Sequence, residues 1–467
     1  MEERAAARRC AVVLVAVYAA LALLLVTEQA GRTTNDTRLE LTEEPGRYLA
    51  GTFSLWNPQV SLGELQNQAY GYLFPQGLWY AALDLVGMPG WLSQRLWSVL
   101  LLLLACEGVR RLARHLVGNP WAAAAAGLVY GLAPRHVTEL GVRSAEILPG
   151  AVLPWALLPI VQAVDGRRRP RDAAVLSAAA YACAGGVNGT ATAAPAALLV
   201  VFVAWAVLRR HLSWRFAAGW AALMAVVNAW WVGSLLQLGR YSPPFFDYVE
   251  DARATTWSSG FAPTLRGTSN WVGYIVVDGE RWWPAGHLLS YEPWVVVGTG
   301  LLAVVGLVGL LRHRGRFRVP LLVSAALGLT CQVIAHTGPL DGPLSQWLQD
   351  LLDGPLAPLR NVAKADPVLR VPLAVGVAVA VADAARVAHR TRRRDRPAGR
   401  VGAGLLVAAL VGALVAGLGT AAAPIVRAET RTPGWGSCLA TGATRRPSSP
   451  SGGSGGSATG RSRAARR

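Results

Sequence analysis

Long apolar runs separated by clusters of arginine constrain this chain more than any other feature. The 467-residue sequence contains such runs along most of its length. Runs of roughly 17 to 22 residues are long enough to cross a hydrocarbon core about 30 Å thick. Only 15% of the residues are charged, whereas soluble globular proteins carry about 25%, and the mean hydropathy is +0.34. The sequence therefore predicts an all-α, multi-pass integral membrane protein.

We expect about 11 membrane spans. They cover approximately residues 10–26, 92–106, 121–133, 148–164, 173–186, 193–208, 216–238, 294–311, 319–335, 368–385 and 401–422. The third, fifth and sixth of these runs are short and could instead be re-entrant or tilted helices. The spans fall within residues 1–424, which we interpret as one transmembrane domain. Residues 425–467 form a low-complexity, basic tail that is predicted to be disordered.

The distribution of charge predicts the orientation in the membrane. A net charge of +18 would suggest a nucleic-acid partner in a soluble chain. Here the arginines lie in short clusters between the apolar runs, as topology signals do. If every run crosses, these clusters share the cytoplasmic side with the N-terminus. The outer side of the plasma membrane then carries residues 28–91, 134–147, 239–293 and 336–367. No nucleic-acid partner is expected.

The outer segments contain short amphipathic stretches, of which residues 344–356 are an example. Trp347, Leu348, Leu351 and Leu352 could face lipid if that stretch lies flat in the interface. An ordinary packed loop helix explains the pattern equally well. The five cysteines form no C-x-x-C pair, so neither a disulfide framework nor a zinc site is predicted. No acidic or histidine cluster has recognisable metal spacing, although a divalent cation as cofactor stays open.

Asp36 is the first candidate for chemistry. It lies about ten residues beyond the first apolar run, between Asn35 and Thr37 and close to Arg32 and Arg38. A carboxylate near arginines stays ionised and can act as a base, although strong pairing would weaken its basicity. The alternatives are a solvated loop aspartate and an N-cap for the residues that follow, since Asp is a preferred cap.

A second group of candidates combines amides with aromatic rings. Amides offer paired hydrogen-bond donors and acceptors, and flat rings stack on sugar rings. This group lies between residues 56 and 79 and contains Asn57, Gln66, Asn67, Gln68, Tyr70 and Tyr72. An interfacial aromatic belt would explain the rings but not the amides. We therefore expect these residues to bind a carbohydrate.

Charged residues near the ends of two outer segments form a third group. Arg240, Tyr241, Asp247 and Glu250 follow the seventh run, and they could bind substrate or metal or be merely solvated. Arg360, Lys364 and Arg370 line the approach to the tenth run on the outer side, against the positive-inside trend. A lipid phosphate is the natural partner of such cations. Lys364 is the single lysine of the chain, which suggests that an ammonium group is needed there.

Several stretches together resemble one known family. They are NDTRLEL, LWNPQVSLGELQNQAYGYLFPQG, QRLW, GGVNGTAT, LGRYSPPFFDYVE, LRGTSNW and LRNVAKADPVLRVPL. In this order they are similar to the membrane part of the actinobacterial arabinofuranosyltransferases of the D type, which belong to the GT-C class of glycosyltransferases. The resemblance covers about residues 10–422.

The resemblance implies a GT-C helical bundle and an inverting transfer outside the plasma membrane. The donor would be decaprenyl-phosphate-arabinose and the acceptor the arabinan of arabinogalactan or lipoarabinomannan. GT-C enzymes carry a catalytic acid in the first external loop, and Asp36 matches that position as general base. Arg240, Arg360 and Lys364 would bind the donor phosphate. No nucleotide is required, because polyprenyl phosphate is the activated carrier.

The C-terminal end departs from the family pattern. Members of the family continue into a large extracytoplasmic part with carbohydrate-binding modules, and nothing in residues 425–467 resembles it. We therefore expect a truncated or frame-shifted chain. Two other functions remain open: a GT-C transferase for another polyprenyl-phosphate sugar such as mannose, and a transporter or flippase of a lipid-linked glycan. A transporter should show an internal repeat, which the sequence lacks.

Overall fold

The computed structural model describes residues 2–27, 30–34, 36, 38–58, 63–65, 69–241, 250–338, 344–393, 410–419 and 422. Within these ranges the chain is almost entirely helical, so the prediction of an all-α fold is confirmed. The strands of the described residues form two short antiparallel pairs: β1 (Trp56–Asn57) with β2 (Glu64–Leu65), and β3 (Val276–Val277) with β4 (Glu280–Arg281). The predicted tail, residues 425–467, lies outside the described residues.

Each predicted apolar run coincides at least in part with a helix. These are α1 (Glu2–Thr27), α5 (Gly90–Val117), α6 (Pro120–Gly131), α8 (Ser144–Val164), α9 (Pro170–Ala182), α10 (Gly189–Leu208), α11 (Trp214–Tyr241), α16 (Pro293–Arg312), α17 (Arg318–Val333), α19 (Asp366–Arg393) and a helix over 410–419. Six helices of the described chain are long and apolar enough to cross a membrane: α1, α8, α10, α11, α16 and α19. The total of about 11 spans remains a prediction.

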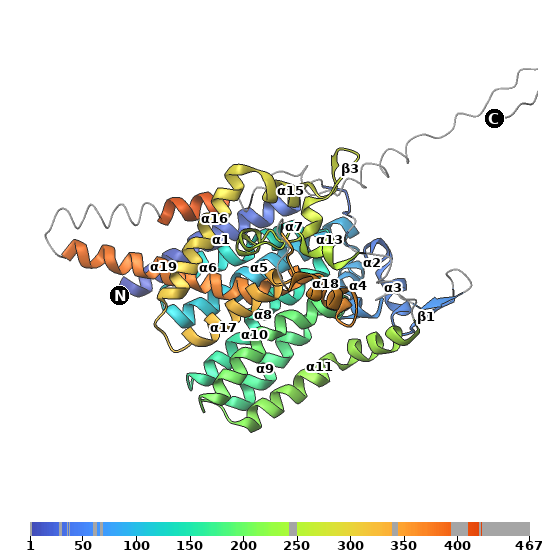
Figure 1. Cartoon of the computed structure of the whole chain (residues 1–467), viewed down its shortest axis with the longest axis horizontal. Coiled ribbons are helices and arrows are strands. Elements are labelled where there is room, and N and C mark those ends of the chain that lie inside the picture. The colour runs from blue at the N-terminus through green and yellow to red at the C-terminus, as the bar shows by residue number, and fades with distance from the viewer. Residues whose placement is uncertain are drawn as a thin grey trace, which may run out of the picture.

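Short helices occupy one end of the bundle, and the N-terminus lies at the other (Figure 1). The short helices are α2 (Leu39–Glu43), α3 (Pro45–Gly51), η1 (Ala69–Tyr72), η2 (Leu73–Gly77), α4 (Leu78–Asp84), α7 (Pro134–Glu139), α13 (Ala252–Thr256), α14 (Phe261–Arg266), η3 (Trp271–Tyr274), α15 (Pro284–Tyr291), α18 (Ser345–Asp353), η4 (Ala357–Leu359) and η5 (Val362–Ala365). All of them fall in segments that the sequence assigns to a single side of the membrane.

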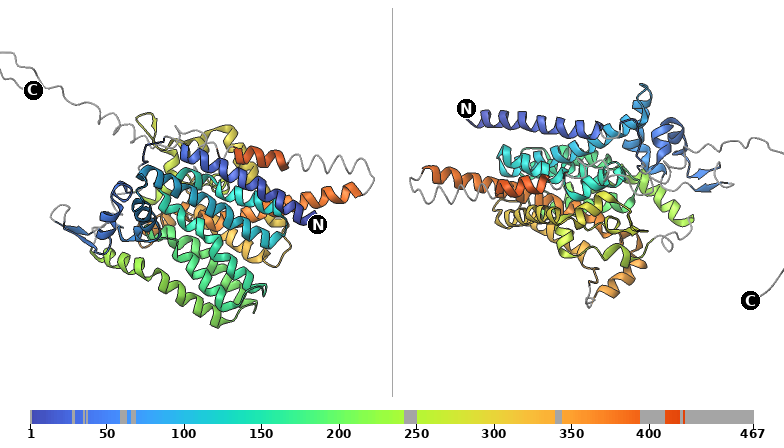
Figure 2. Two further views of the ribbon diagram at one scale, coloured as in Figure 1. Left: turned by 180° about the vertical axis from the view of Figure 1, so that it is seen from behind. Right: turned by 90° about the horizontal axis from the view of Figure 1, so that it is seen from above.

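The interior of the bundle is built around α8 and α19. In the apolar part of α8, 83% of the residues are buried, compared with 11% for α11 and 22% for α1. The helix α5 packs against α6 and α8, and α19 packs against α16, α17 and α6. Figure 2 shows α1 and α11 along the outside of the bundle. The two outer helices therefore have their apolar surfaces available to lipid.

Proline shapes the buried helix α8. Pro149, Pro154 and Pro159 lie inside it, and a proline has no N–H to donate to the carbonyl four residues earlier. Pro154 therefore leaves the Gly150 carbonyl without its helical donor, and a backbone group at membrane depth needs another partner. The Tyr130 hydroxyl of α6 donates to this carbonyl at 2.7 Å. A side chain of α6 thus supplies the hydrogen bond that Pro154 removes from α8.

Glycines allow α16 and α19 to approach closely. A Cβ added at Gly309 would overlap the Gly376 carbonyl, and one added at Gly376 would overlap the Gly306 carbonyl. Small residues are typical of tight helix contacts in membranes, where backbones pack directly. This contact fixes the position of α19, which begins beside Lys364.

The amphipathic helix α18 packs as a loop helix. Leu352 is buried in a cluster with Ala335 and Val362, and Leu348 packs against the same cluster. Trp347 is 59% exposed. Of the two interpretations of this stretch, the packed loop helix is therefore the one that describes Leu348 and Leu352, because their side chains pack against the neighbouring outer segments.

We predict that Gly309→Ala destabilises the bundle by about 1–3 kcal/mol, the usual cost of adding a methyl group to a closed contact. The thermal unfolding temperature of the purified protein in detergent measures this effect. Gly300→Ala is the matched control, because Gly300 lies on the same helix and a Cβ there would meet nothing within 4 Å. An equal loss in both variants would contradict the close α16–α19 contact.

Candidate active site

The carboxylate of Asp36 lies at the start of α8. Asp36 is 4% exposed, and its Oδ1 accepts a hydrogen bond from the Ser144 backbone N–H at 3.0 Å. The first turn of a helix has N–H groups without helical acceptors and carries a partial positive charge. This position therefore favours the ionised carboxylate. Asp36 is neither a solvated loop residue nor the N-cap of α2, which is Arg38.

Gln94 of α5 fixes the segment that carries Asp36. Its side-chain Oε1 accepts from the Thr34 backbone N–H at 2.8 Å, and its Nε2 donates to the Thr34 carbonyl at 2.9 Å. The Thr34 hydroxyl donates to the Gly141 carbonyl at 2.6 Å. Gln94 is fully buried. Its amide satisfies two backbone groups at once, so the loop is held two residues before Asp36.

Further polar side chains surround this point. The Ser144 hydroxyl accepts from Gln76 Nε2 at 3.2 Å and from Trp97 Nε1 at 3.1 Å. Tyr80 interacts electrostatically with Asp36. Burial raises the pKa of Tyr80 well above its usual value, and the negative charge of Asp36 raises that pKa further. Tyr80 therefore stays protonated beside the carboxylate.

A network of buried and partly buried charges lies around the start of α8, and we call it the α8 charge cluster. It consists of Arg135, Glu139, Arg143, Glu146 and Lys364. Glu146 lies 3.7 Å from the Arg135 guanidinium and 4.0 Å from the Lys364 ammonium. Glu139 lies 3.3 Å from the Arg143 guanidinium and 3.8 Å from that of Arg135. The two carboxylates thus hold three cations together.

Neutral amides and one further acid complete the surroundings of the cluster. Asn270 donates to Glu139 at 2.7 Å, and Asn188 donates to Glu146 at 3.4 Å. Glu250 lies near enough to act electrostatically on Arg143 and Lys364. Burial acts to lower the pKa of Arg143, but the charges of Glu139, Glu146 and Glu250 outweigh burial and raise it. The Arg143 guanidinium therefore stays charged.

Asp36 and Lys364 each contact the first turn of α8. Ser144 binds Asp36, and Glu146, two residues later, pairs with Lys364. Two residues rise about 3 Å along a helix axis. Residues from the first outer segment and from the approach to α19 thus both contact the first turn of α8. That Asp36 and Lys364 share one site remains a prediction.

The other predicted cations have different surroundings. Arg360 is buried, and its guanidinium lies 3.6 Å from Asp353. Arg370 pairs with Asp366 at 2.6 Å and donates to the carbonyls of Leu265 and Thr264. The expected lipid-phosphate partner of Arg370 is therefore replaced by protein groups. Arg240 is exposed at the end of α11.

The predicted carbohydrate-binding residues are partly packed into the protein. Tyr70 lies in a cluster with Trp231 and Leu238 of α11, and burial raises the pKa of Tyr70 to about 12. Tyr72 is also buried, with its ring 6.0 Å from that of Tyr48. Asn57 is partly exposed in β1, and Tyr241 is 66% exposed. The remaining predicted residues, Gln66, Asn67, Gln68 and Asp247, lie outside the described residues.

Sequence analysis did not single out four members of the charge cluster. Arg135, Glu139 and Arg143 recur every four residues, a spacing that puts side chains on one helix face, and Glu146 follows. Charges next to an apolar span are costly and need partners, so this spacing was the available signal. Within the described part of the chain, no group of three or more His, Cys, Asp or Glu side chains could hold a metal ion.

The fold and the site define a multi-pass helical membrane protein with an acid and several cations gathered at one end of its bundle. Comparison with known proteins gives the family. The family described as "Alpha-(1->3)-arabinofuranosyltransferase, N-terminal GT-C domain" matches residues 20–435. The chain belongs to this family of GT-C glycosyltransferases.

Mycobacterial relatives are similar over most of the chain. The alpha-(1->3)-arabinofuranosyltransferase of Mycolicibacterium smegmatis is 39% identical over 362 residues, which are 77% of this chain and 25% of the relative. The protein of the same name from Mycobacterium tuberculosis is 39% identical over 365 residues, 77% of this chain and 26% of the relative. This chain thus spans about a quarter of the length of these relatives.

A solved structure shares the fold. The cryo-EM structure of arabinofuranosyltransferase AftD from Mycobacteria superposes with a TM-score of 0.64 at 30% sequence identity. The match covers 88% of this chain and 27% of that one. The prediction of a GT-C-type helical bundle is therefore confirmed.

His136, next to Arg135 in α7, provides a pH-dependent test of this region. Its ring lies 5.6 Å from that of Tyr130. The pKa of His136 is lowered from 6.5 to about 4, mainly by burial; Asp366 acts to raise this pKa and Arg135 to lower it. Since the unfolded chain binds this proton more readily, stability is complete above pH 6.5 and falls as the pH drops toward 4.

We predict that the loss between these pH values is about 3 kcal/mol. Thermal unfolding of the purified protein at a series of pH values measures it. His136→Gln should flatten the profile relative to the parent protein, because the titrating group is gone. His389→Gln is the control, since His389 is exposed at the opposite end, and it should keep the parent profile. Identical profiles for all three proteins would contradict a buried neutral His136.

Proposed function

We propose that the chain carries the reaction centre for transfer of arabinofuranose from decaprenyl-phosphate-arabinose to an arabinan acceptor, with inversion at the anomeric carbon. The observation that supports it is that Asp36 and Lys364 both contact the first turn of α8 in a chain of this family. Such a transfer needs a base for the acceptor hydroxyl and positive charge for the phosphate leaving group. The acceptor would belong to arabinogalactan or lipoarabinomannan.

Asp36 would act as the general base. Its carboxylate takes the proton of the acceptor hydroxyl while the hydroxyl oxygen bonds to the anomeric carbon. The bond from that carbon to the phosphate oxygen breaks on the opposite face, so the configuration inverts. The Ser144 N–H orients the carboxylate and keeps it ionised before the reaction.

Lys364 would neutralise the phosphate as it leaves. The Lys364 ammonium shares Glu146 with Arg135, and Arg135 shares Glu139 with Arg143. Three cations therefore lie within one network. A phosphate that enters the network would share these cations with Glu139 and Glu146. Arg360, held by Asp353, would position the Lys364 segment, and Arg240 would reach the phosphate from the rim.

Sugar contacts would come from the outer segments around this point. Glu250, which senses Arg143 and Lys364, is suited to a sugar hydroxyl. Asn57, Gln66, Asn67, Gln68, Tyr70, Tyr72, Tyr241 and Asp247 remain proposed contacts. Tyr70 and Tyr72 would contribute edges rather than stacking faces, because their rings are buried in the protein.

The end that carries Asp36 would face outward. Arginines gather at the opposite end, in the C-terminal parts of α5 and α19 and in the turns after α8, α10 and α16, and arginine-rich loops favour the cytoplasm. The N-terminus of α1 lies at that arginine-rich end (Figure 1). A lipid-linked donor would therefore reach Asp36 from the outer leaflet of the plasma membrane.

We predict that Asp36→Asn lowers the transfer rate by about 10²–10⁴, the usual contribution of a general base. The amide keeps an oxygen that can accept from the Ser144 N–H, so folding and donor binding should be unchanged. The measurement is transfer of labelled arabinose from decaprenyl-phosphate-arabinose to an arabinan oligosaccharide by the purified chain. Asp84→Asn, an exposed aspartate at the same end of the bundle, serves as the control. Near-normal turnover of Asp36→Asn would contradict the proposed role.

We predict that Lys364→Ala raises the KM for the donor on the order of tenfold or more, because a buried charge pair loses one partner and the phosphate one cation. The KM for the acceptor should change little. Lys364→Arg restores the charge and should recover part of the donor affinity. Arg281→Ala, an exposed cation in β4, is the control. Equal changes in both KM values would count against a phosphate-binding lysine.

The same assay separates the other functions. A decaprenyl-phosphate-mannose donor tests a transferase for another sugar, and movement of a lipid-linked glycan across vesicles without a new glycosidic bond tests a flippase. Activity with mannose alone, or translocation alone, would overturn the arabinofuranosyl proposal.

A further inference from the structure

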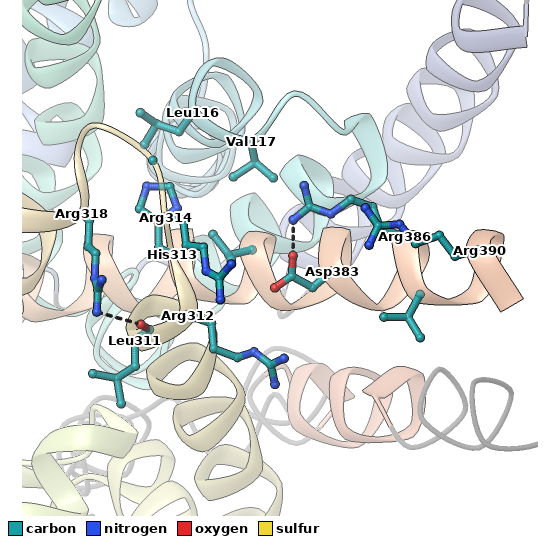
Figure 3. Close-up of a pocket in the computed structure, with 13 residues that line it drawn as sticks. Leu116, Val117, Leu311, Arg312, His313, Arg314, Arg318, Asp383, Arg386 and Arg390 are labelled. Carbon is teal, nitrogen blue, oxygen red and sulfur yellow. Dashed lines mark hydrogen bonds and ion pairs between the residues drawn. The ribbon is translucent and has the colours of Figure 1, made fainter. Parts of the chain in front are cut away.

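A cavity lies at the end of the bundle opposite to Asp36. Its volume is about 860 Å³, and its walls come from the end of α5, the turn between α16 and α17 and the C-terminal part of α19 (Figure 3). Five arginines line it: Arg312, Arg314, Arg318, Arg386 and Arg390. Residues from three distant parts of the sequence thus direct positive charge to one space.

These arginines have little negative charge beside them. Asp383 is the one carboxylate in the lining, and it pairs with Arg386. Among the described residues, no carboxylate lies within ion-pair distance of Arg312, Arg314 or Arg390. Like charges around a cavity repel one another and create a strong positive potential. A bound anion would relieve that repulsion.

Some of the other arginines at the same end have a carboxylate partner. Glu107 binds both Arg110 and Arg111, at 2.6 Å and 2.7 Å, and Asp165 lies 3.1 Å from Arg316. The topology signal explains why arginines gather at this end. It does not explain why five arginines from α16, α17, α19 and the turn between α16 and α17 line a single cavity that contains one carboxylate.

Two further features of the lining indicate the kind of anion. His313 is 6% exposed and lines the cavity, and its Nε2 has no hydrogen-bond partner among the described residues. Aliphatic side chains form the remaining wall: Leu116, Val117, Leu311, Val379 and Val387. Guanidinium groups match the geometry of phosphate oxygens, and an aliphatic wall suits the carbon chain next to a lipid headgroup.

We propose that this cavity binds a phosphate group, carried either by an anionic lipid or by a soluble phosphate ester. The site is separate from the one that contains Asp36, and its ligand is not the transferred sugar. The arginines supply the charge, and His313 supplies a buried polar group at the base of the turn. By the orientation proposed above, the cavity opens toward the cytoplasm and its anionic leaflet.

The test uses the purified 467-residue chain in detergent. Native mass spectrometry compares retention of phosphatidylglycerol with that of phosphatidylcholine, and thermal unfolding is followed with added inorganic pyrophosphate. The test variant is Arg312→Gln with Arg390→Gln. The matched control, Arg171→Gln with Arg209→Gln, removes the same charge from exposed positions at the same end but outside the cavity.

We expect the parent chain and the control to retain phosphatidylglycerol preferentially, and the test variant to lose this preference on the order of tenfold. If pyrophosphate stabilises the parent chain and phosphatidylglycerol is not preferred, the site binds soluble phosphate esters. Loss of the pyrophosphate stabilisation in the test variant then confirms that the phosphate binds in this cavity. Equal losses in both variants, or no response of the parent chain to either probe, would overturn the proposal. Unfolding without ligand shows that the variants are folded.

Discussion

The hydrogen bond from the Ser144 N–H to the Asp36 carboxylate joins the first outer segment to the central helix of the bundle. Everything else in the candidate site is arranged around that helix start. Gln94 of α5 forms hydrogen bonds with the backbone of Thr34 in this loop. Glu146, two residues after Ser144 in α8, pairs with Lys364. The N-terminal end of the helix supplies a backbone N–H and a partial positive charge to this buried carboxylate, in place of some of the water it has lost.

The two ends of the bundle manage charge in different ways. At the Asp36 end, Glu139 and Glu146 are matched by three cations in a buried network. Removal of one partner from such a network is expensive, at about 3–5 kcal/mol, so the network is rigid and can present its cations to a ligand. At the other end, the arginines around the cavity share a single carboxylate, Asp383, within the lining. Balanced charge suits a reaction centre, and excess charge suits an anion site.

Much of the fold follows from the sequence because span length and apolar composition are local properties. Each predicted run coincides at least in part with a helix, and α16 and α19 begin within two residues of the predicted starts. Asp36 and Lys364 could be chosen from the sequence because a lone acid and a lone lysine beside apolar runs need a reason. Their contacts with the first turn of α8 could not, since these depend on how distant helices pack.

The partners and the burial of several other side chains could not be predicted from the sequence either, because they also depend on how distant segments pack. Arg360 and Arg370 have the composition of phosphate-binding residues, yet Asp353 and Asp366 occupy their guanidinium groups. Tyr70 and Tyr72 look like sugar platforms, but contacts with α11 and Tyr48 bury their rings. The role of Gln94 depends on two backbone groups sixty residues away.

The proposed transfer reaction requires the acid and the cations to surround a single bound phosphate and its sugar. A cryo-EM structure of the chain with decaprenyl phosphate tests this most directly. The proposed mechanism predicts phosphate density beside the Lys364 ammonium and the Arg143 guanidinium. The prenyl chain should lead into lipid, and Asp36 should face the space for the sugar. Phosphate density at the opposite end of the bundle alone, or a bound phosphate separated from Asp36 by packed side chains, would contradict it.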